Sequence, residues 1–366
     1  LADVVIGLGH LGVDPSSSPW TSEEVIAHTS GFDAFIDGHS HTVMENKQVQ
    51  DASGKAVTLT QTGSYFANVG EMTIAADGTI TTKLIPTHEG MDAGIAAMQT
   101  SWVNTVDDML GEKIAVGDSD FYVSDPATGK RRIRSAETNL GDFVADGIYT
   151  YFNEVEKLHC DVAIMNGGGI RADVPAGDWT FKTCKQVSPF GNVACLMSVT
   201  GKQIQDALEF AARFAGEDGK ENGGFLQVAG ATYEIHTDIP NTVQTDEKNV
   251  WIGSATGTPR VQNVKIYDKA SGSYLPLDPG ATYALAGMNY TLRNLGDGFA
   301  MFDGAELIKD YVSEDYLVMS TYAMIFDGAD AAGLPHLSSA NSPLAAYPGY
   351  LLDYEQPYGA GRITIL

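Results

Sequence analysis

The sequence predicts two domains, an α/β domain followed by a larger domain that mixes helices and strands. Three observations support this prediction. The chain has 366 residues, which is more than one hydrophobic core normally supports. Its first 90 residues alternate short apolar runs with polar connections, as parallel α/β folds do. A long amphipathic stretch near residue 100 then separates this part from a second set of apolar runs.

In the first domain, apolar runs predict strands at Val4 to Leu8 and Phe32 to Ile36, with a helix around Thr21 to His28 between them. Two further strands are expected at Ala56 to Gln61 and Val69 to Ala75, the second ending in the turn sequence "ADGT". Strands separated by helices favour a parallel sheet, whose carboxyl-terminal edge collects functional side chains.

The amphipathic stretch predicts one long helix over residues 91–113. Its apolar residues recur at helical spacing between the polar residues Asp92 and Glu112 and are Ile95, Met98, Trp102, Val106 and Met109. We interpret this helix as the connector between a first domain, residues 1–90, and a second domain, residues 114–366.

The second domain is expected to begin with a helix whose apolar face carries Leu140, Phe143, Val144, Gly147 and Tyr151. The run "CDVAIMN" predicts a strand that leads into the loop "GGGIR". Thr200 and Gln203 form a capping-box pattern ahead of a helix that ends near Gly216. Further strands are expected at Phe225 to Ile235, Val261 to Tyr267 and Thr282 to Ala286.

Composition excludes several classes of partner. A formal net charge of −25 repels nucleic-acid backbones and acidic membrane surfaces, and no apolar run approaches the roughly 20 residues of a membrane span. The three cysteines, Cys160, Cys184 and Cys195, have no CxxC spacing, so they predict neither a zinc knuckle nor a disulfide framework. With this charge, an anionic substrate requires a local group of cations.

Three of the eight histidines follow predicted strands of the first domain. His10 comes after the first strand, and His39 and His41 stand in the sequence "GHSHT" after the next, where Gly38 permits a sharp turn. Imidazoles are common ligands of divalent metals, so we expect the three side chains to meet at one sheet edge as a metal site. The alternative is that each histidine forms only local hydrogen bonds.

Basic residues are scarce, yet Lys130, Arg131, Arg132 and Arg134 stand together, and Arg171 closes the loop "NGGGIR". A guanidinium group suits phosphate, and glycines allow backbone N–H groups to approach an anion or a base. We therefore interpret Arg134 and Arg171 as candidate phosphate ligands, and the segment from Lys130 to Arg132 as a solvated turn.

Two aromatic residues lie in loops rather than on periodic apolar faces. Phe190 stands in "SPFGN" and Tyr290 in "NYTLRNLGDGF", and two such rings could enclose a nucleobase. Asp297, in "GDGF", could accept hydrogen bonds from ribose hydroxyl groups, although a turn aspartate is the simpler interpretation.

Seven motifs in order carry a resemblance to a known family: "GLGHLGVD", "GHSHT", "ETNLGD", "NGGGIR", "SPFGN", "GGFLQVAG" and "NLGDGF". Together they resemble the 5'-nucleotidase and UDP-sugar hydrolase family of bimetallic phosphohydrolases. The resemblance implies the C-terminal part of a calcineurin-like metallophosphatase domain, a linker helix and the α+β C-terminal domain of 5'-nucleotidases. It also implies two divalent metal ions in the complete enzyme, of the kind Zn, Mn, Mg or Ca.

The resemblance implies roles for individual residues. His10 and His39 correspond to ligands of the second metal, and His41 to a position that supplies a ligand to the first metal in some relatives. Other positions correspond to substrate contacts: Arg134 and Arg171 for the phosphate and ribose side, Asn166 and Gly168 for the base edge, Phe190 and Tyr290 for stacking, and Asp297 for the ribose.

By the resemblance, the family's D-x-H, G-D and G-N-H-E motifs, which supply the other metal ligands and the catalytic His–Asp dyad, precede the region where this chain begins, and the sequence contains no G-N-H-E. No catalytic residue is therefore assigned, and the chain is expected to be part of a longer enzyme whose N-terminal segment completes the metal site. An extracytoplasmic location, secreted or on the cell surface, is expected from the family.

The expected function is hydrolysis of 5'-nucleotides, and possibly of nucleotide diphosphates or UDP-sugars, to nucleoside and phosphate by a metal-activated hydroxide. One alternative is a catalytically incomplete protein that binds nucleotides or acts as a surface interaction protein. A second alternative is a 2',3'-cyclic-nucleotide 2'-phosphodiesterase/3'-nucleotidase, against which the "NGGGIR" motif argues.

Overall fold

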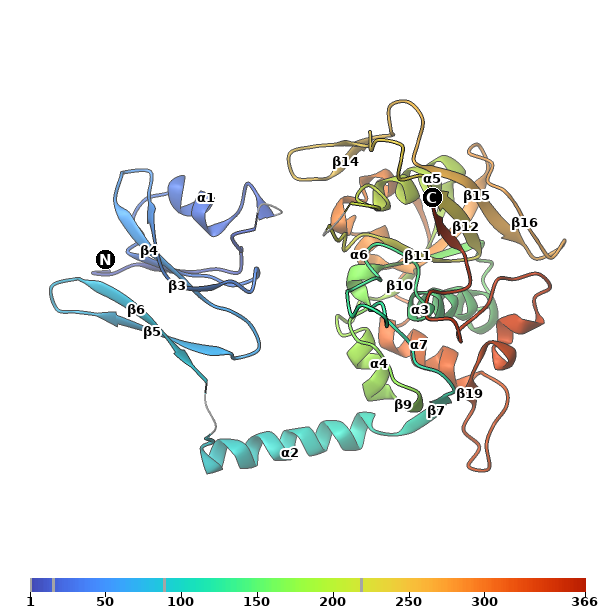
Figure 1. Ribbon diagram of the computed structural model, residues 1–366, viewed down its shortest axis with the longest axis horizontal. Helices are drawn as coiled ribbons and strands as arrows, with labels where there is room; N and C mark the ends of the chain where they lie inside the picture. Colours follow the sequence, from blue (N-terminus) through green and yellow to red (C-terminus); the bar gives the residue numbers. More distant parts are fainter. Residues whose placement is uncertain (1, 15–16, 88–89, 218–219) are drawn as a thin grey trace. The chain divides into compact units, whose positions relative to one another are not determined.

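In the computed structural model, which describes residues 2–14, 17–87, 90–217 and 220–366, the chain divides into two units, residues 1–99 and 100–366 (Figure 1). Each unit has its own hydrophobic core. Within the described residues, no helix combines the length and the apolar character that a membrane crossing requires.

The smaller unit contains a four-stranded sheet in the order β1 (Ile6–Leu8), β2 (Ala34–Ile36), β4 (Ala56–Thr62) and β3 (Val43–Gln50). The first three strands are parallel, as predicted, whereas β3 pairs antiparallel with β4. Helix α1 (Ser22–Ala27) begins at a capping box formed by Thr21 and Glu24. A separate antiparallel hairpin follows, formed by β5 (Asn68–Ile74) and β6 (Ile80–Pro86).

The long helix predicted over residues 91–113 is present as α2 (Ala93–Leu110). Its apolar residues are exposed, including Ile95, Met98, Trp102, Val106 and Met109. The periodicity therefore predicted the helix correctly, and its role as an inter-domain connector stays a prediction.

The larger unit is built around a mixed five-stranded sheet in the order β11 (Leu226–Ala229), β8 (Val162–Asn166), β17 (Thr282–Met288), β10 (Ala194–Thr200) and β18 (Glu306–Lys309). Strands β8 and β17 are parallel, and the other neighbours are antiparallel. In β8, Val162 and Ile164 pack into one core, whereas Ala163 and Met165 pack into the other. The sheet is therefore buried on both faces, which explains the continuous apolar run.

Helices cover the two faces of this sheet. Helix α3 (Asn139–Thr150), extended by the π-helical turn Tyr151–Val155, contributes Leu140 and Phe143 to one core, and α5 (Gly201–Ala211) contributes Ile204 and Leu208 to the other. The other helices are α4 (Phe181–Val187), α6 (Asn289–Leu292) and α7 (Asp315–Met324), with 3-10 turns at Gly167–Gly169, Gly296–Gly298, Ala300–Phe302, Ser339–Asn341 and Pro343–Ala346.

Three smaller sheets complete the larger unit. One has the order β16 (Ser273–Pro276), β15 (Val261–Asp268), β12 (Ala231–Ile235) and β20 (Ile363–Ile365). A second has the order β19 (His336–Leu337), β7 (Lys113–Gly117) and β9 (Gly177–Thr180), and β13 (Gln244–Thr245) pairs with β14 (Trp251–Gly253).

The strand predicted at Phe225 to Ile235 is instead two strands in different sheets, because the chain turns at Gly230. Gly230 has a φ of +71°, and a Cβ atom there would lie 2.4 Å from the carbonyl oxygen of Asp161. Only glycine meets both conditions. The capping box of Thr200 and Gln203 is present as predicted.

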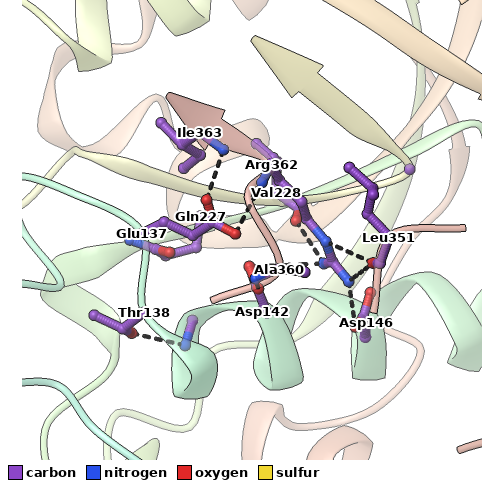
Figure 2. A network of polar contacts seen from close by, with 12 residues as sticks. Glu137, Thr138, Asp142, Asp146, Gln227, Val228, Leu351, Ala360, Arg362 and Ile363 are labelled. Atoms are coloured by element: carbon purple, nitrogen blue, oxygen red, sulfur yellow. Dashed lines mark hydrogen bonds and ion pairs between the residues drawn. The ribbon is translucent and has the colours of Figure 1, made fainter. Parts of the chain in front are cut away.

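A buried ion network joins the C-terminal strand to α3 (Figure 2). The guanidinium group of Arg362 is fully buried, contacts Asp146 at 2.7 Å and donates to the carbonyl oxygens of Val228 and Leu351. Burial lowers the pKa of Arg362, but Asp142 and Asp146 raise it well above its ordinary value. The charged arginine therefore neutralises carboxylates that have no access to water.

We expect Arg362→Met to lower the free energy of unfolding of the larger unit by about 3–5 kcal/mol, because it leaves buried carboxylates without a counter-ion. Urea unfolding followed through the fluorescence of buried Trp179 measures this loss. The loss should be smaller at about pH 5 than at pH 7, since burial already raises the pKa of Asp142, and a neutral carboxyl group needs no cation.

Arg293→Met serves as the control, because Arg293 forms an ion pair with Asp310 on the surface, with 41% of the arginine side chain exposed. We expect it to change the free energy of unfolding by less than about 1 kcal/mol. Equal losses in the two variants would contradict the importance of the buried network.

Candidate functional site

The predicted substrate-binding residues of the larger unit converge at one edge of the five-stranded sheet. Asn166 ends β8, and Tyr290 follows β17, which runs parallel to β8. Strand β10 runs antiparallel to β17 with Ala194 opposite Met288, so the loop that carries Phe190 reaches the same edge. Hydrogen bonds between Val193 and Asn289 join this loop to α6.

Asp297 is held by two of the predicted residues. One carboxylate oxygen accepts a hydrogen bond from the hydroxyl group of Tyr290 at 2.9 Å, and the other accepts one from the Asn166 side chain at 3.2 Å. Burial, followed by the charge of Asp297, raises the pKa of Tyr290 to about 12, so the phenol stays a donor. Asp297 has the positive φ of a turn residue, +54°, but its side chain also joins Tyr290 to Asn166.

Arg171 links the glycine loop to Phe190. Its guanidinium group donates to the carbonyl oxygen of Gly168 at 3.4 Å and lies 5.8 Å from the centre of the Phe190 ring. Phe190 is 60% exposed and Tyr290 36% exposed, so both rings remain accessible. A Cβ atom on Gly296 would lie 2.5 Å from the Tyr290 ring, so glycine lets this ring lie against the backbone.

The glycine loop packs closely on neighbouring backbone, and its expected contact with an anion or a base stays a prediction. The N–H groups of Gly167 and Gly168 donate to the carbonyl oxygens of Phe225 and Gly223, each at 2.7 Å. A Cβ atom on Gly167 would lie 2.3 Å from the carbonyl oxygen of Ile133. The missing side chains therefore allow backbone to pack on backbone, and these two amides are already occupied.

Arg134 lies in a local group of charges. Its guanidinium group is 3.7 Å from Glu221, which also contacts Arg131 at 3.3 Å. Burial lowers the pKa of Arg134, the charges of Arg131 and Arg171 lower it further, and Glu221 and Asp297 oppose this shift. Four charged residues therefore act on Arg134, and with it they carry one net positive charge.

The segment that carries Arg134 is fixed by buried polar groups that the motif search did not interpret. Gln227, which is fully buried on β11, donates to the carbonyl oxygens of Ile133 and Ala136 at 3.1 and 2.9 Å. Glu137 accepts hydrogen bonds from the backbone of Arg362 and Ile363 at 3.0 and 2.7 Å (Figure 2). Glu137, the first residue of the "ETNLGD" motif, therefore has a structural role.

Two further charged residues belong to this region and were missed by sequence reasoning. Glu221 bridges Arg131 and Arg134, and buried Arg213 is close enough for the charge of Asp297 to raise its pKa, although burial lowers that pKa to about 10. Arg132, predicted to be solvated, instead donates to the carbonyl oxygen of Glu137 and lies over Tyr358. Glu221 stands two residues before the motif "GGFLQVAG", which is the one sequence signal that could have drawn attention to it.

In the smaller unit, His10 and His39 lie together, with ring centres 5.1 Å apart. Buried Asp37 ties the two strand ends by accepting from the N–H groups of Leu11 and Gly12 at 2.8 and 3.0 Å. The ring of His41 lies 6.1 Å from Tyr65. Histidines 39 and 41 themselves take positive φ values, +74° and +55°.

The described residues do not form a complete metal centre. No group of three or more His, Cys, Asp or Glu side chains within them is arranged to hold a metal ion. The exposed pair of His10 and His39 offers two imidazoles, which is fewer than the three protein ligands of a typical catalytic zinc site. The residues present therefore do not fit a two-metal centre by themselves.

Comparison with known proteins identifies relatives along most of the chain. The trifunctional nucleotide phosphoesterase protein YfkN of Bacillus subtilis is 30% identical over 328 residues, and the apyrase of Tabanus yao is 26% identical over 350 residues. These alignments cover 86% and 88% of this chain but 20% and 58% of the relatives. The chain thus spans less than two thirds of either relative.

Solved structures share the fold. The 5'-nucleotidase precursor of Thermus thermophilus matches with a TM-score of 0.57 and 24% identity over 94% of this chain and 61% of that one. A protein of Staphylococcus aureus assigned as a 5'-nucleotidase, solved with α-ketoglutarate, matches with a TM-score of 0.61 and 17% identity over 100% of this chain and 64% of that one.

The model of one protein family, the 5'-nucleotidase C-terminal domain, matches residues 115–304, which is more than half of the chain. The matched region contains the whole cluster of predicted substrate contacts, from Arg134 to Asp297. The chain therefore belongs to the 5'-nucleotidase family through this C-terminal domain.

Proposed function

We propose that this chain is part of a 5'-nucleotidase-type phosphohydrolase and that its larger unit binds the nucleotide at the edge of the five-stranded sheet. The observation that carries this proposal is the convergence of two accessible rings, Phe190 and Tyr290, with the arginines and polar side chains described above. Base, ribose and phosphate each find suitable groups there.

Each part of a nucleotide has a proposed partner. Phe190 and Tyr290 stack on the base, and the side-chain oxygen of Asn166, which is buried and has no partner among the described residues, accepts a hydrogen bond from the base edge. Gly168, which packs on Gly223 and lies beside the Asn166 side chain, is proposed as a second contact of the base edge. Asp297 accepts from the ribose, because each carboxylate oxygen can accept more than one hydrogen bond.

Arg134 and Arg171 are proposed to bind the phosphate. Arg134 is largely shielded, with 21% of its side chain exposed, and Arg171 is exposed beside Phe190. A charge-assisted hydrogen bond to phosphate is stronger than a neutral one, particularly where water is partly excluded. The arginines therefore distinguish a nucleotide from its nucleoside, whereas the rings bind both.

Hydrolysis in this family rests, by the resemblance, on two divalent ions that supply a hydroxide and polarise the phosphate. We propose that His10 and His39 contribute ligands to such a centre, with His41 as a further candidate, and that the ligands beyond them come from the N-terminal segment of the longer protein. Under this proposal the chain contributes these ligands and the orientation of the nucleotide.

The remaining assignments rest on the resemblance. We propose that residues 1–90 belong to a calcineurin-like metallophosphatase domain, that residues 91–113 link it to residues 114–366, and that the protein is extracytoplasmic. The names of the relatives, a phosphoesterase and an apyrase, support nucleotide substrates.

We expect Phe190→Ala and Tyr290→Ala each to weaken adenosine binding by about 1–3 kcal/mol, because each removes one stacking surface. Calorimetric titration of the 366-residue chain with EDTA present measures binding without metal. Phe66→Ala is the control, since Phe66 is 88% exposed and belongs to the other unit. No saturable adenosine binding by the wild-type chain would refute the proposed function.

Arg134→Met should weaken AMP binding by about 1.5–3 kcal/mol while leaving adenosine binding nearly unchanged, because it removes a charged partner of the phosphate alone. The same titrations, run with both ligands, give the two affinities. Arg293→Met, which removes an exposed cation that is paired with Asp310, is the matched control. An equal loss for both ligands would show that Arg134 supports the fold rather than the phosphate.

If His10 and His39 are metal ligands, the chain should bind Zn²⁺ weakly, and His39→Ala should abolish this binding. His28→Ala is the control, because the ring of His28 is hydrogen-bonded at the end of α1 to the carbonyl oxygen of Glu24. Equal Zn²⁺ affinity of wild type and His39→Ala in calorimetry would mean that the two histidines are local structure.

A further inference from the structure

Glu221 occupies a position that an anionic ligand would otherwise take. Its carboxylate lies 3.3 Å from Arg131 and 3.7 Å from Arg134, so it bridges two guanidinium groups. The side chain of Glu221 is 40% exposed and that of Arg131 is 46% exposed, so neither is locked in the interior. A carboxylate between two arginines is the arrangement that a phosphate group forms with the same residues.

We propose that Glu221 substitutes for the substrate phosphate in the free protein, and that it must leave Arg134 when a nucleotide binds. Glu221 then sets how strongly the site prefers a nucleotide to the corresponding nucleoside. This inference rests on the proposed nucleotide-binding function of the same cluster and adds a specificity-determining residue to it.

The charges of the cluster support this role. Arg131, Arg134 and Arg171 contribute three positive charges, and Glu221 and Asp297 contribute two negative ones. A phosphate monoester carries a charge between about −1.5 and −2 at pH 7, so it gains little from a cluster with one net positive charge while Glu221 remains in place. Without the charge of Glu221 the cluster has two net positive charges, whereas a neutral nucleoside is indifferent to the change.

The structure leaves room for the displaced side chain. Glu221 and Arg131 line an open cavity of about 570 Å³, which is also lined by Lys130, Glu217 and Lys220. The backbone beside Glu221 is fixed, because the N–H group of Asn222 donates to the carbonyl oxygen of Arg134 at 3.1 Å. The exchange therefore needs only a rotation of the Glu221 side chain into this cavity.

The test compares Glu221→Gln with Glu217→Gln in the full chain. Glu217 lines the same cavity and carries the same charge, but its carboxylate pairs with Lys220 at 2.6 Å. Calorimetry gives the affinities for AMP and adenosine, and their ratio is the measured quantity. We expect Glu221→Gln to raise the ratio about two- to fivefold, which is the upper part of the range for a partly exposed ion pair, and Glu217→Gln to change it less than about 1.5-fold.

Other outcomes overturn the inference. An unchanged ratio in Glu221→Gln means that the carboxylate does not compete, and a lowered ratio means that Glu221 is a positioning residue that orients Arg134. If Glu217→Gln raises the affinity ratio equally, the effect comes from the loss of any negative charge nearby and not from the position of Glu221. If neither the wild-type chain nor any variant binds adenosine, the proposed function fails, and the inference fails with it. If adenosine binds but the ratio does not rise in Glu221→Gln, only the inference fails.

Discussion

The proposed nucleotide-binding region of the larger unit depends on the register between β10 and β17. Ala194 lies opposite Met288, and this pairing brings the loop of Phe190 beside the helix of Tyr290. A slip by one residue would exchange the two faces of a strand. In β10, Leu196 belongs to one core and Cys195 to the other, so both faces of this strand are buried and a slip would disturb both cores. The two cores that bury the sheet thereby also fix the geometry of the site.

A second constraint reaches the site from the C-terminal end of the described chain. Arg362 directly precedes strand β20, its guanidinium group neutralises buried Asp146, and its backbone N–H group donates to Glu137 (Figure 2). Breaking a buried ion pair is costly because one charge is left without a partner. Since Glu137 lies three residues after Arg134, a network without access to water holds the segment that carries this arginine.

Local signals predicted local structure well. The capping box of Thr200 and Gln203 and the periodicity of α2 depend on neighbours within a few turns, and both elements are present. The turn at Gly230 depends on the distant carbonyl group of Asp161, so the apolar run looked like one strand. The mixed pairing of the central sheet likewise follows from contacts far apart in sequence, which a pattern of apolar residues does not encode.

At the candidate site, sequence motifs likewise indicated which residues are present but not which residues they contact. Motifs identified Asn166 and Asp297, but the bond between them joins positions 131 residues apart. Glu221 was missed because its role exists only through the folded positions of two arginines. Such partners matter more than the total charge of −25, because charges farther away than about 10 Å are largely screened at 0.1 M salt. Charges within 4 Å of each other are screened much less, so the few side chains around Arg134 determine the local charge that a nucleotide would meet under the proposed function.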